Sequence, residues 1–198
     1  HLLGAIARLK PERVAMENVA GFFTSRAREL VRATFADAGY TARDFILCPT
    51  TLGVPNKRER YYLVAARHEL PERAIAERPM RPLSEYLDED PDEALFLEEE
   101  LVAKHGPGMR ILERAQATDP NTISNCFTGA YGRTFRFSGS FLSEPNGRTR
   151  YFSTAEVARL LGFADTLCMP PSFTQRQAYK YLGNSLSVHA VREVLRLF

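Results

Sequence analysis

The sequence has few cysteines, and they are not arranged as in a metal site or a disulfide framework. Only Cys48, Cys126 and Cys168 are present, and none belongs to a Cys-x-x-Cys pair. An odd number without paired spacing argues against both structural zinc and a disulfide-stabilised fold. We therefore expect no metal. With 198 residues, 44% of them apolar, the chain can bury one sizeable core, or a core plus a small lobe.

Long apolar stretches and targeting signals are also missing. No apolar run approaches the roughly 18 residues of a membrane-spanning helix, and no signal-peptide pattern precedes the first helix-like stretch. We expect an intracellular protein, in the cytoplasm or the nucleus. The sequence opens at His1 directly on the apolar helical pattern LLGAIARLK, without a methionine. We interpret this start as that of a fragment of a longer chain.

Basic residues are absent from one stretch and abundant elsewhere. Residues 85–100 carry nine acidic side chains and no lysine or arginine, so the rest of the chain holds 26 basic against 15 acidic side chains. This distribution suits a partner that carries phosphates, such as a nucleic acid, with the acidic stretch facing away from it. Charge alone leaves open a globular protein that binds no nucleic acid.

The first third of the chain alternates helix and strand patterns. Helices are predicted over 2–10 and 26–38, and strands over 13–19, 44–48 and 61–66. The apolar run 13–19 is typical of a buried parallel strand. This order of elements indicates the second half of an open α/β sheet.

The composition changes after this region. Prolines and acidic residues dominate 68–120, and short strand-and-turn patterns follow over 122–142. Regular helices then return, the first opening on a capping box of Ser153 and Glu156, with further helices over 174–182 and from Ser187 onward. We therefore predict three parts: residues 1–67 as the second half of a catalytic α/β domain, 68–150 as a target-recognition lobe, and 151–198 as helices that return to the catalytic domain.

Five short stretches carry the chemically informative side chains. Each alone has a structural explanation: a carboxylate at a strand end often caps a helix, an Arg-x-Arg pair is usually solvated, and Gly-Asn-Ser is usually a turn. Their order and spacing make the combination informative. The stretches are Glu17-Asn18-Val19, Asn56-Lys57-Arg58-Glu59-Arg60, Asn125-Cys126-Phe127-Thr128 with Tyr131-Gly132, Tyr151-Phe152-Ser153 through Leu161-Gly162-Phe163, and Gln177-x-Tyr179-x-x-Leu182-Gly183-Asn184-Ser185.

This combination resembles the cytosine-C5 methyltransferase family. Glu17-Asn18-Val19 matches the sixth motif of that family, and the stretch from Asn56 to Arg60 matches the eighth, where glutamine usually stands in place of Asn56. Residues 151–163 and 177–188 match the ninth and tenth motifs. The resemblance covers nearly the whole chain except 75–120. It implies part of a Rossmann-like α/β methyltransferase domain that depends on S-adenosylmethionine, with a small mixed target-recognition lobe.

The resemblance also implies a substrate. The run 49–65, the Cys-Phe-Thr segment at 126–128 and the sequence LGNSLSVH at 182–189 look like the branch that methylates a cytosine in the anticodon loop of tRNA. Two alternatives stay open. One is a DNA cytosine-C5 methyltransferase, and the other is a non-catalytic nucleic-acid-binding paralogue that keeps the fold.

The family match implies a role for each residue of the first two motifs. Glu17, from a buried position on its strand, hydrogen-bonds the N3 and N4 edge of an extruded cytosine, with Asn18 and Val19 beside the base. Arg60 contacts the cytosine O2. Arg58 either pairs with a backbone phosphate or braces the active-site loop.

Two further groups are implied at the cofactor and in the lobe. Three residues near the C-terminus are expected to close the S-adenosylmethionine pocket, and three lobe residues are expected to contact the substrate. Tyr131, one of the lobe residues, fits the core of the lobe equally well. The groups are Asn184, Ser185 and Val188 for the cofactor, and Thr128, Tyr131 and Arg133 for the substrate.

The catalytic cysteine and the glycine-rich cofactor turn of the family are not found in the sequence. The resemblance implies that a thiolate adds to cytosine C6, from a cysteine that follows a proline upstream of the Glu-Asn-Val strand. Residues 1–16 contain no cysteine, and Cys48 precedes Pro49 instead, so we interpret Cys48 as structural. No Gly-x-Gly run follows a predicted strand. We expect the nucleophile outside this chain and no methyl transfer by these residues alone.

Overall fold

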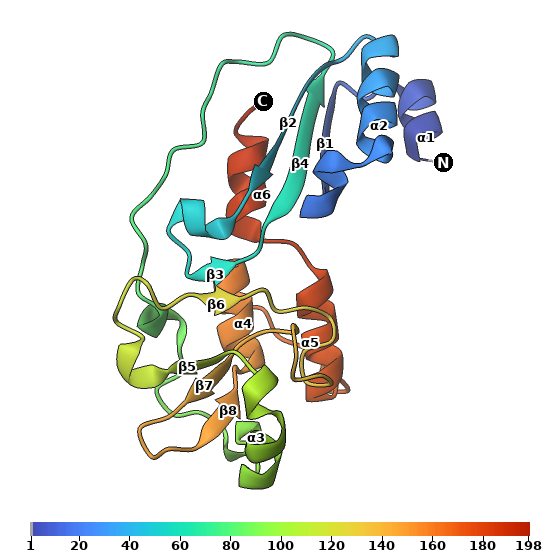
Figure 1. The fold of residues 1–198 in the computed structure, drawn as a ribbon. Coiled ribbons are helices and arrows are strands. Elements are labelled where there is room, and N and C mark those ends of the chain that lie inside the picture. Colours follow the sequence, from blue (N-terminus) through green and yellow to red (C-terminus); the bar gives the residue numbers. More distant parts are fainter. Residues whose placement is uncertain (1) are drawn as a thin grey trace. The chain divides into compact units, whose positions relative to one another are not determined.

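The computed structural model describes residues 2–198, which form two compact units (Figure 1). The first unit contains the residues up to 48, residues 59–77 and residues 190–198. The second contains residues 49–58 and 78–189. The chain therefore passes repeatedly between the two units, and neither is a continuous segment.

The first unit is built on a three-stranded antiparallel sheet. Its order is β1-β4-β2, with β4 (Arg60–Ala66) in the centre and β1 (Arg13–Val19) and β2 (Thr41–Leu47) on either side. β4 is buried from Tyr61 to Ala66, so both of its faces are covered. These aromatic, β-branched and aliphatic residues suit a central strand.

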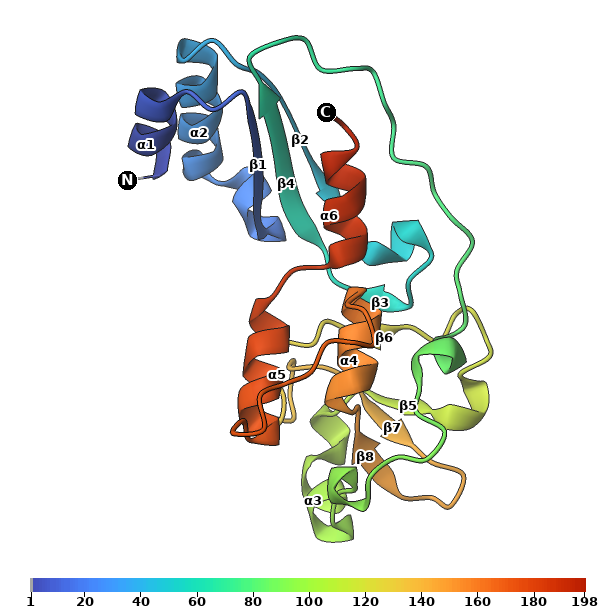
Figure 2. The same cartoon turned by 180° about the vertical axis from the view of Figure 1, so that it is seen from behind.

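Helices cover the sheet of the first unit. Figures 1 and 2 show α1 (Leu2–Leu9) and α2 (Arg26–Asp37) on one side of it and the C-terminal α6 (Val188–Leu195) on the other. The core between the sheet and the two N-terminal helices combines alternate β4 residues with one face of each helix. Its buried members are Ile6, Val31, Phe35, Tyr40, Tyr61, Leu63 and Ala65.

β1 differs from the buried parallel strand that its apolar sequence predicted. It pairs antiparallel with β4, and its residues alternate between exposed and half-buried. Val14 and Met16 pack against the core, whereas Glu17 and Val19 face solvent. The position of the strand was predicted correctly, but its direction and burial were not. An apolar run indicates that a strand forms and carries no information about the direction of the partner strand.

The second unit contains two small sheets. β5 (Ile111–Glu113), β7 (Phe141–Ser143) and β8 (Thr149–Tyr151) form a mixed sheet in which β7 is central. β3 (Asn56–Lys57) and β6 (Ser124–Asn125) form a short parallel pair. The strands are short and separated by turns, as the sequence predicted for the lobe.

Three helices complete the second unit: α3 (Glu99–His105), α4 (Thr154–Leu161) and α5 (Gln175–Asn184). α4 begins at the predicted capping box, in which Ser153 and Glu156 satisfy each other's backbone N–H groups. α5 begins with a second capping box, which the sequence analysis did not identify.

An aromatic core joins α4 and α5 to the lobe. Tyr131 is central to it, with its ring centroid 4.8 Å from that of Tyr179 on α5 and 5.6 Å from that of Phe141 on β7. The residues from 151 to 189 therefore group with the lobe, and only 190–198 group with the first unit. The compact units thus divide the chain differently from the predicted return of 151–198 to the catalytic domain.

The acidic stretch 85–100 is folded into turns and the start of α3. Leu87 and Leu95 are buried, whereas every acidic residue of the stretch except the half-buried Asp88 is exposed. The two leucines hold the stretch to the lobe while its carboxylates face solvent. Within residues 2–198, no helix is long and apolar enough to cross a membrane.

Candidate base-binding residues and nucleic-acid interface

Glu17-Asn18-Val19 and Arg60, which belong to two separate motifs, meet where β1 ends and β4 begins. Antiparallel pairing sets Val19 opposite Arg60 and Glu17 opposite Tyr62. Arg60 Nε lies 3.3 Å from Glu17 Oε1, and an Arg60 Nη donates a hydrogen bond of 2.8 Å to the carbonyl oxygen of Glu59. The sheet therefore brings together a carboxylate and a guanidinium from two motifs that are distant in sequence.

Glu17 is accessible, not buried as predicted. The Glu17 side chain is 31% exposed and that of Arg60 is 19% exposed. The reason is that β1 has one solvent face and Glu17 lies on it. A carboxylate that faces both solvent and a guanidinium can exchange part of its ion pair for hydrogen bonds to a polar ligand.

Asn18 and Val19 shape the end of the strand. The side-chain oxygen of Asn18 accepts a hydrogen bond of 2.8 Å from the backbone N–H of Val19. The chain then enters a 3₁₀ turn over Ala20–Thr24. The exposed Val19 leaves an apolar surface at the end of the strand that carries Glu17.

Arg58 holds separate segments of the second unit together. Arg58 is only 3% exposed to solvent. Nη1 donates to the Phe127 carbonyl oxygen at 3.1 Å and to Cys126 Sγ at 3.2 Å. Nη2 donates to the carbonyl oxygens of Gly183, at 3.2 Å, and Ser185. These contacts hold the segment at 126–127 and the segment at 183–185 together, and the buried guanidinium faces neither solvent nor a phosphate.

A close backbone contact joins the same segments. A Cβ atom on Gly183 would lie 2.1 Å from the carbonyl carbon of Thr128, and one on Gly129 would lie 2.6 Å from Asn184 Oδ1. Real Cβ atoms do not approach other atoms so closely, so position 183 requires glycine. The Gly-Asn-Ser turn therefore packs directly on the loop that follows Cys-Phe-Thr.

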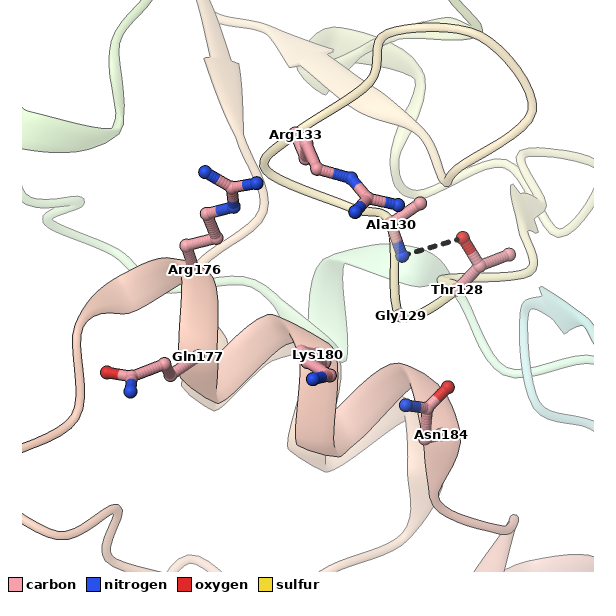
Figure 3. Close-up of a pocket in the computed structure, with 8 residues that line it drawn as sticks. All are labelled: Thr128, Gly129, Ala130, Arg133, Arg176, Gln177, Lys180 and Asn184. Atoms are coloured by element: carbon pink, nitrogen blue, oxygen red, sulfur yellow. Dashed lines mark hydrogen bonds between the residues drawn. The ribbon is translucent and has the colours of Figure 1, made fainter.

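A cationic pocket of about 550 Å³ opens beside this contact. Figure 3 shows α5 as one wall, carrying Arg176, Lys180 and Asn184, and the loop with Thr128 and Arg133 as the other. The side chains that line it include three cations and no carboxylate among the residues that the structure describes. Guanidinium and ammonium groups without a neighbouring carboxylate suit a phosphate. The lining residues are Thr128, Gly129, Ala130, Arg133, Arg176, Gln177, Lys180 and Asn184.

Two of the three predicted substrate contacts in the lobe line this pocket, and the third does not. Thr128 and Arg133 are pocket residues, with Thr128 Oγ1 accepting a hydrogen bond of 3.3 Å from the Ala130 N–H. Tyr131 is only 1% exposed, and its hydroxyl donates to the Ser140 carbonyl oxygen at 2.6 Å. Burial raises the pKa of the Tyr131 phenol well above its usual range. Tyr131 is thus a core residue, and its prediction as a substrate contact is wrong.

Arg176 and Lys180 were not predicted as site residues. The signal that identifies them is the spacing of Arg176, Lys180 and Asn184, which recur every fourth residue of α5 and so lie on one helix face. The sequence does not show that the loop carrying Arg133 lies opposite this helix face. The loop and the helix are more than 40 residues apart in sequence.

The three residues predicted for the cofactor have other neighbours in the second unit. Asn184 lines the cationic pocket. Ser185 donates its hydroxyl to the Leu182 carbonyl oxygen at 2.6 Å, and its own carbonyl oxygen accepts from Arg58. Val188 begins α6.

The three cysteines differ in their exposure. Cys48 and Cys126 are half-buried and Cys168 is exposed. Within residues 2–198, no group of three or more histidine, cysteine or acidic side chains could hold a metal ion. Cys126 contacts Arg58, which places its thiol in the brace between the lobe loop and α5.

Comparison with known proteins identifies the family. The sequence pattern of the C-5 cytosine-specific DNA methylase family matches residues 2–134, which is more than half of the chain. The tRNA (cytosine(38)-C(5))-methyltransferase of Spodoptera frugiperda is 27% identical over 240 residues, an alignment that covers all of this chain and 69% of that protein.

Solved structures agree with this match. A methyltransferase of Entamoeba histolytica, EhMeth, superposes with a TM-score of 0.88 at 25% identity, covering 99% of this chain and 67% of that one. The Dnmt2 methyltransferase of S. pombe superposes with a TM-score of 0.87 at 27% identity, covering 99% and 70%. The predicted α/β methyltransferase fold, present in part, is confirmed. The chain belongs to the C-5 cytosine-specific methylase family, whose members are cytosine-C5 methyltransferases.

Proposed function

We propose that this chain is part of an enzyme that methylates C5 of a cytosine in the anticodon loop of a tRNA, with S-adenosylmethionine as the methyl donor. The observation that carries the proposal is the cationic pocket between the Cys-Phe-Thr loop and α5, whose charges suit the phosphates of an RNA. The relatives of the chain support the choice of RNA, since the one from Spodoptera frugiperda is named for cytosine 38 of tRNA.

The chemistry assigns roles to the exposed pair at the sheet edge. C5 of cytosine is a poor nucleophile until a thiolate adds to C6, after which C5 can take a methyl group and lose its proton as the thiolate leaves. The Glu17 carboxyl faces the N3 and N4 edge of the extruded base, where it accepts a hydrogen bond from the N4 amino group and shares a proton with N3. This arrangement stabilises the charge that develops on the ring. Arg60 gives up part of its ion pair with Glu17 and donates a hydrogen bond to the cytosine O2.

We further propose that the nucleophilic cysteine lies outside these 198 residues. Cys126 supports this view, because its thiol contacts Arg58 within the brace of the second unit. Cys48 follows the end of β2 and precedes Pro49. Neither position matches the family's cysteine after a proline, upstream of the strand that carries Glu17.

S-adenosylmethionine, when bound, supplies an electrophilic methyl group. The residues predicted to hold it, Asn184, Ser185 and Val188, do not fit such a group by themselves. The polar atoms of Ser185 are engaged by Leu182 and Arg58, and Asn184 borders a pocket whose cations would repel a sulfonium. We therefore assign no step of the reaction to these three residues.

A DNA cytosine-C5 methyltransferase is the second candidate. The description of the matching family, a DNA methylase, is the observation that favours it. The two candidates share their chemistry, so only the substrate distinguishes them.

The deciding experiment measures methyl transfer from labelled S-adenosylmethionine by the complete protein and by the 198-residue chain. We expect the complete protein to methylate tRNA and not duplex DNA, and the chain alone to methylate neither. Efficient methylation of duplex DNA would establish the second candidate. Binding of tRNA without transfer by the complete protein would indicate a non-catalytic paralogue, and turnover by the chain alone would contradict the proposed location of the cysteine.

A further inference from the structure

An exposed aromatic side chain, Tyr181, lies on α5 beside the cationic pocket and packs against the half-buried Phe173. Phe173, just before the N-cap residue Thr174, stacks on Tyr181, with ring centroids 5.1 Å apart and planes inclined by 23°. Tyr181 remains 59% exposed although Phe173 covers part of it. The ring is thus held in one orientation while much of its surface is open.

Helix geometry places this pair next to the pocket. Gln177 precedes Tyr181 by four residues and Asn184 follows it by three, and residues with these spacings are neighbours on a helix surface. Both neighbours line the cationic pocket. Gln177 is fixed by the capping box, since its Oε1 accepts from the Thr174 N–H at 2.8 Å. The surface of α5 therefore carries an aromatic stripe directly beside its polar and cationic stripe, along which Figure 3 shows Arg176, Lys180 and Asn184.

We propose that Tyr181, held by Phe173, is a stacking platform for one unpaired base of the RNA whose phosphate occupies the cationic pocket. The inference rests on the proposed function, because it takes the ligand to be RNA. Proteins that bind unpaired nucleotides combine cations for the backbone with exposed aromatic rings on which bases stack. The bases of a duplex are covered by their neighbours, so the platform selects a loop or a bulge.

The charge on this surface supports a nucleotide over an apolar partner. Arg133, Arg176 and Lys180 line the adjoining pocket, and no carboxylate joins them among the residues that the structure describes. A protein helix docking its apolar side chains on Tyr181 would leave these three cations without complementary charge. One nucleotide supplies both an anionic phosphate and a flat apolar ring.

The test uses an RNA stem-loop in which each loop position in turn carries the fluorescent base 2-aminopurine, titrated with the 198-residue chain. We expect Tyr181→Ala to weaken binding of the stem-loop about 10-fold and to abolish the fluorescence quenching at one loop position. Tyr181→Phe should retain both, because it keeps the ring. Binding of the fully paired stem should be unchanged in both variants.

Two controls separate this inference from the proposed function. Leu30→Ala removes another exposed apolar side chain, on α2, and should leave binding unchanged. Lys180→Ala should weaken stem-loop and duplex alike, because it removes a phosphate contact. If Lys180→Ala weakens binding and Tyr181→Ala does not, the platform is refuted and RNA binding stands. If the chain binds no RNA, the platform is refuted, and methyl transfer by the complete protein decides the proposed function separately.

Discussion

Glu17 and Arg60 share an ion pair at the open end of the sheet, and a bound cytosine has to replace part of it. We predict that Glu17→Gln lowers the rate of methyl transfer by the complete protein about 10²–10³-fold, because the amide cannot supply a proton to N3. Thermal unfolding should be unchanged, since Glu17 lies on the solvent face of β1. The measurement is single-turnover transfer of a labelled methyl group.

Glu12→Gln is the matched control for this prediction. Glu12 is an exposed acid just before β1, and its backbone oxygen accepts from the Arg67 N–H, so the substitution leaves the strand pairing in place. If the Glu17→Gln enzyme transfers the methyl group as fast as the Glu12→Gln enzyme, Glu17 has no role in the reaction.

Asp44 on β2 gives the first unit a pH-dependent stability. It accepts hydrogen bonds from Arg28 Nε at 2.5 Å, from the Tyr61 hydroxyl at 3.1 Å and from Arg32. Burial opposes ionisation, but the hydrogen bonds from Arg28 and Tyr61 and the charge of Arg32 outweigh it, so the pKa of Asp44 lies below the ordinary 3.8. The stabilisation is therefore present above that value and is lost as the pH falls through the lower pKa of the folded protein.

Asp44→Asn tests this assignment. We predict that it lowers the free energy of unfolding by about 2 kcal/mol near neutral pH, because the arginines lose a charged acceptor. The difference from the parent chain should shrink as the pH falls below about 4. Urea denaturation at a series of pH values measures it, and a difference that stays constant with pH would assign the stabilisation to another group.

At the residue scale, the sequence supports a prediction where the order of motifs singles out a side chain. Glu17 and Arg60 follow from the order of the motifs, and the sheet does bring them together. Their exposure did not follow, because it depends on which face of β1 is covered. Tyr131 shows the same limit: an aromatic residue in a polar loop suits base stacking and core packing equally, and only the packing of Phe141 and Tyr179 around it decides.

At the scale of elements, the contact between the lobe loop and the end of α5 depends on one glycine. We predict that Gly183→Ala destabilises the second unit by about 3 kcal/mol, because its Cβ would lie 2.1 Å from the carbonyl carbon of Thr128, which is backbone and cannot move alone. It should also weaken RNA binding, since the displaced loop carries Arg133. Urea denaturation and RNA titration are the measurements.

Gly4→Ala is the control for the same chemical change. Gly4 lies inside α1 with nothing within 4 Å of an added Cβ, so alanine there should stabilise the chain by about 0.5–1 kcal/mol. Equal effects of the two substitutions would mean that helix propensity, and not the close contact, determines the result at position 183.

Helices were the elements most reliably predicted from sequence. The capping box of Ser153 and Glu156 begins α4 where expected, because both partners lie within one turn. The direction of β1 was missed, because it is set by pairing with β4, some 40 residues later in the chain. Local signals identify elements, and the contacts that orient them are distant in sequence.

At the scale of the whole molecule, the distribution of charge predicts how binding responds to salt. We predict that Arg133→Ala, Arg176→Ala and Lys180→Ala each reduce the slope of the logarithm of RNA affinity against the logarithm of salt concentration by about one, since each removes one phosphate contact. Arg196→Ala, whose charge is already paired with Glu193 at 2.7 Å, should leave the slope unchanged. If all four variants show the same slope of RNA affinity against salt concentration, the pocket is not the phosphate site.

The division of the molecule was less predictable than its parts. The change in composition predicts a boundary near residues 68–75, and the helices of 151–198 were predicted to return to the catalytic domain. α4 and α5 group with the second unit, because Phe152 and Tyr179 are buried in the same core as Phe127 and Tyr131, whereas residues 190–198, most of α6, group with the first. Aromatic residues scattered along the sequence do not show which of them share a core.

The Arg58 brace has a consequence for biosynthesis. Arg58 is synthesised well before its acceptors at Phe127, Gly183 and Ser185. Until then its guanidinium stays hydrated, because burying a charge without its acceptors is unfavourable. The lobe loop can therefore reach its final conformation only after α5 has left the ribosome. A nascent chain stalled before that point would carry all the residues of the loop and none of the contacts that hold it in place.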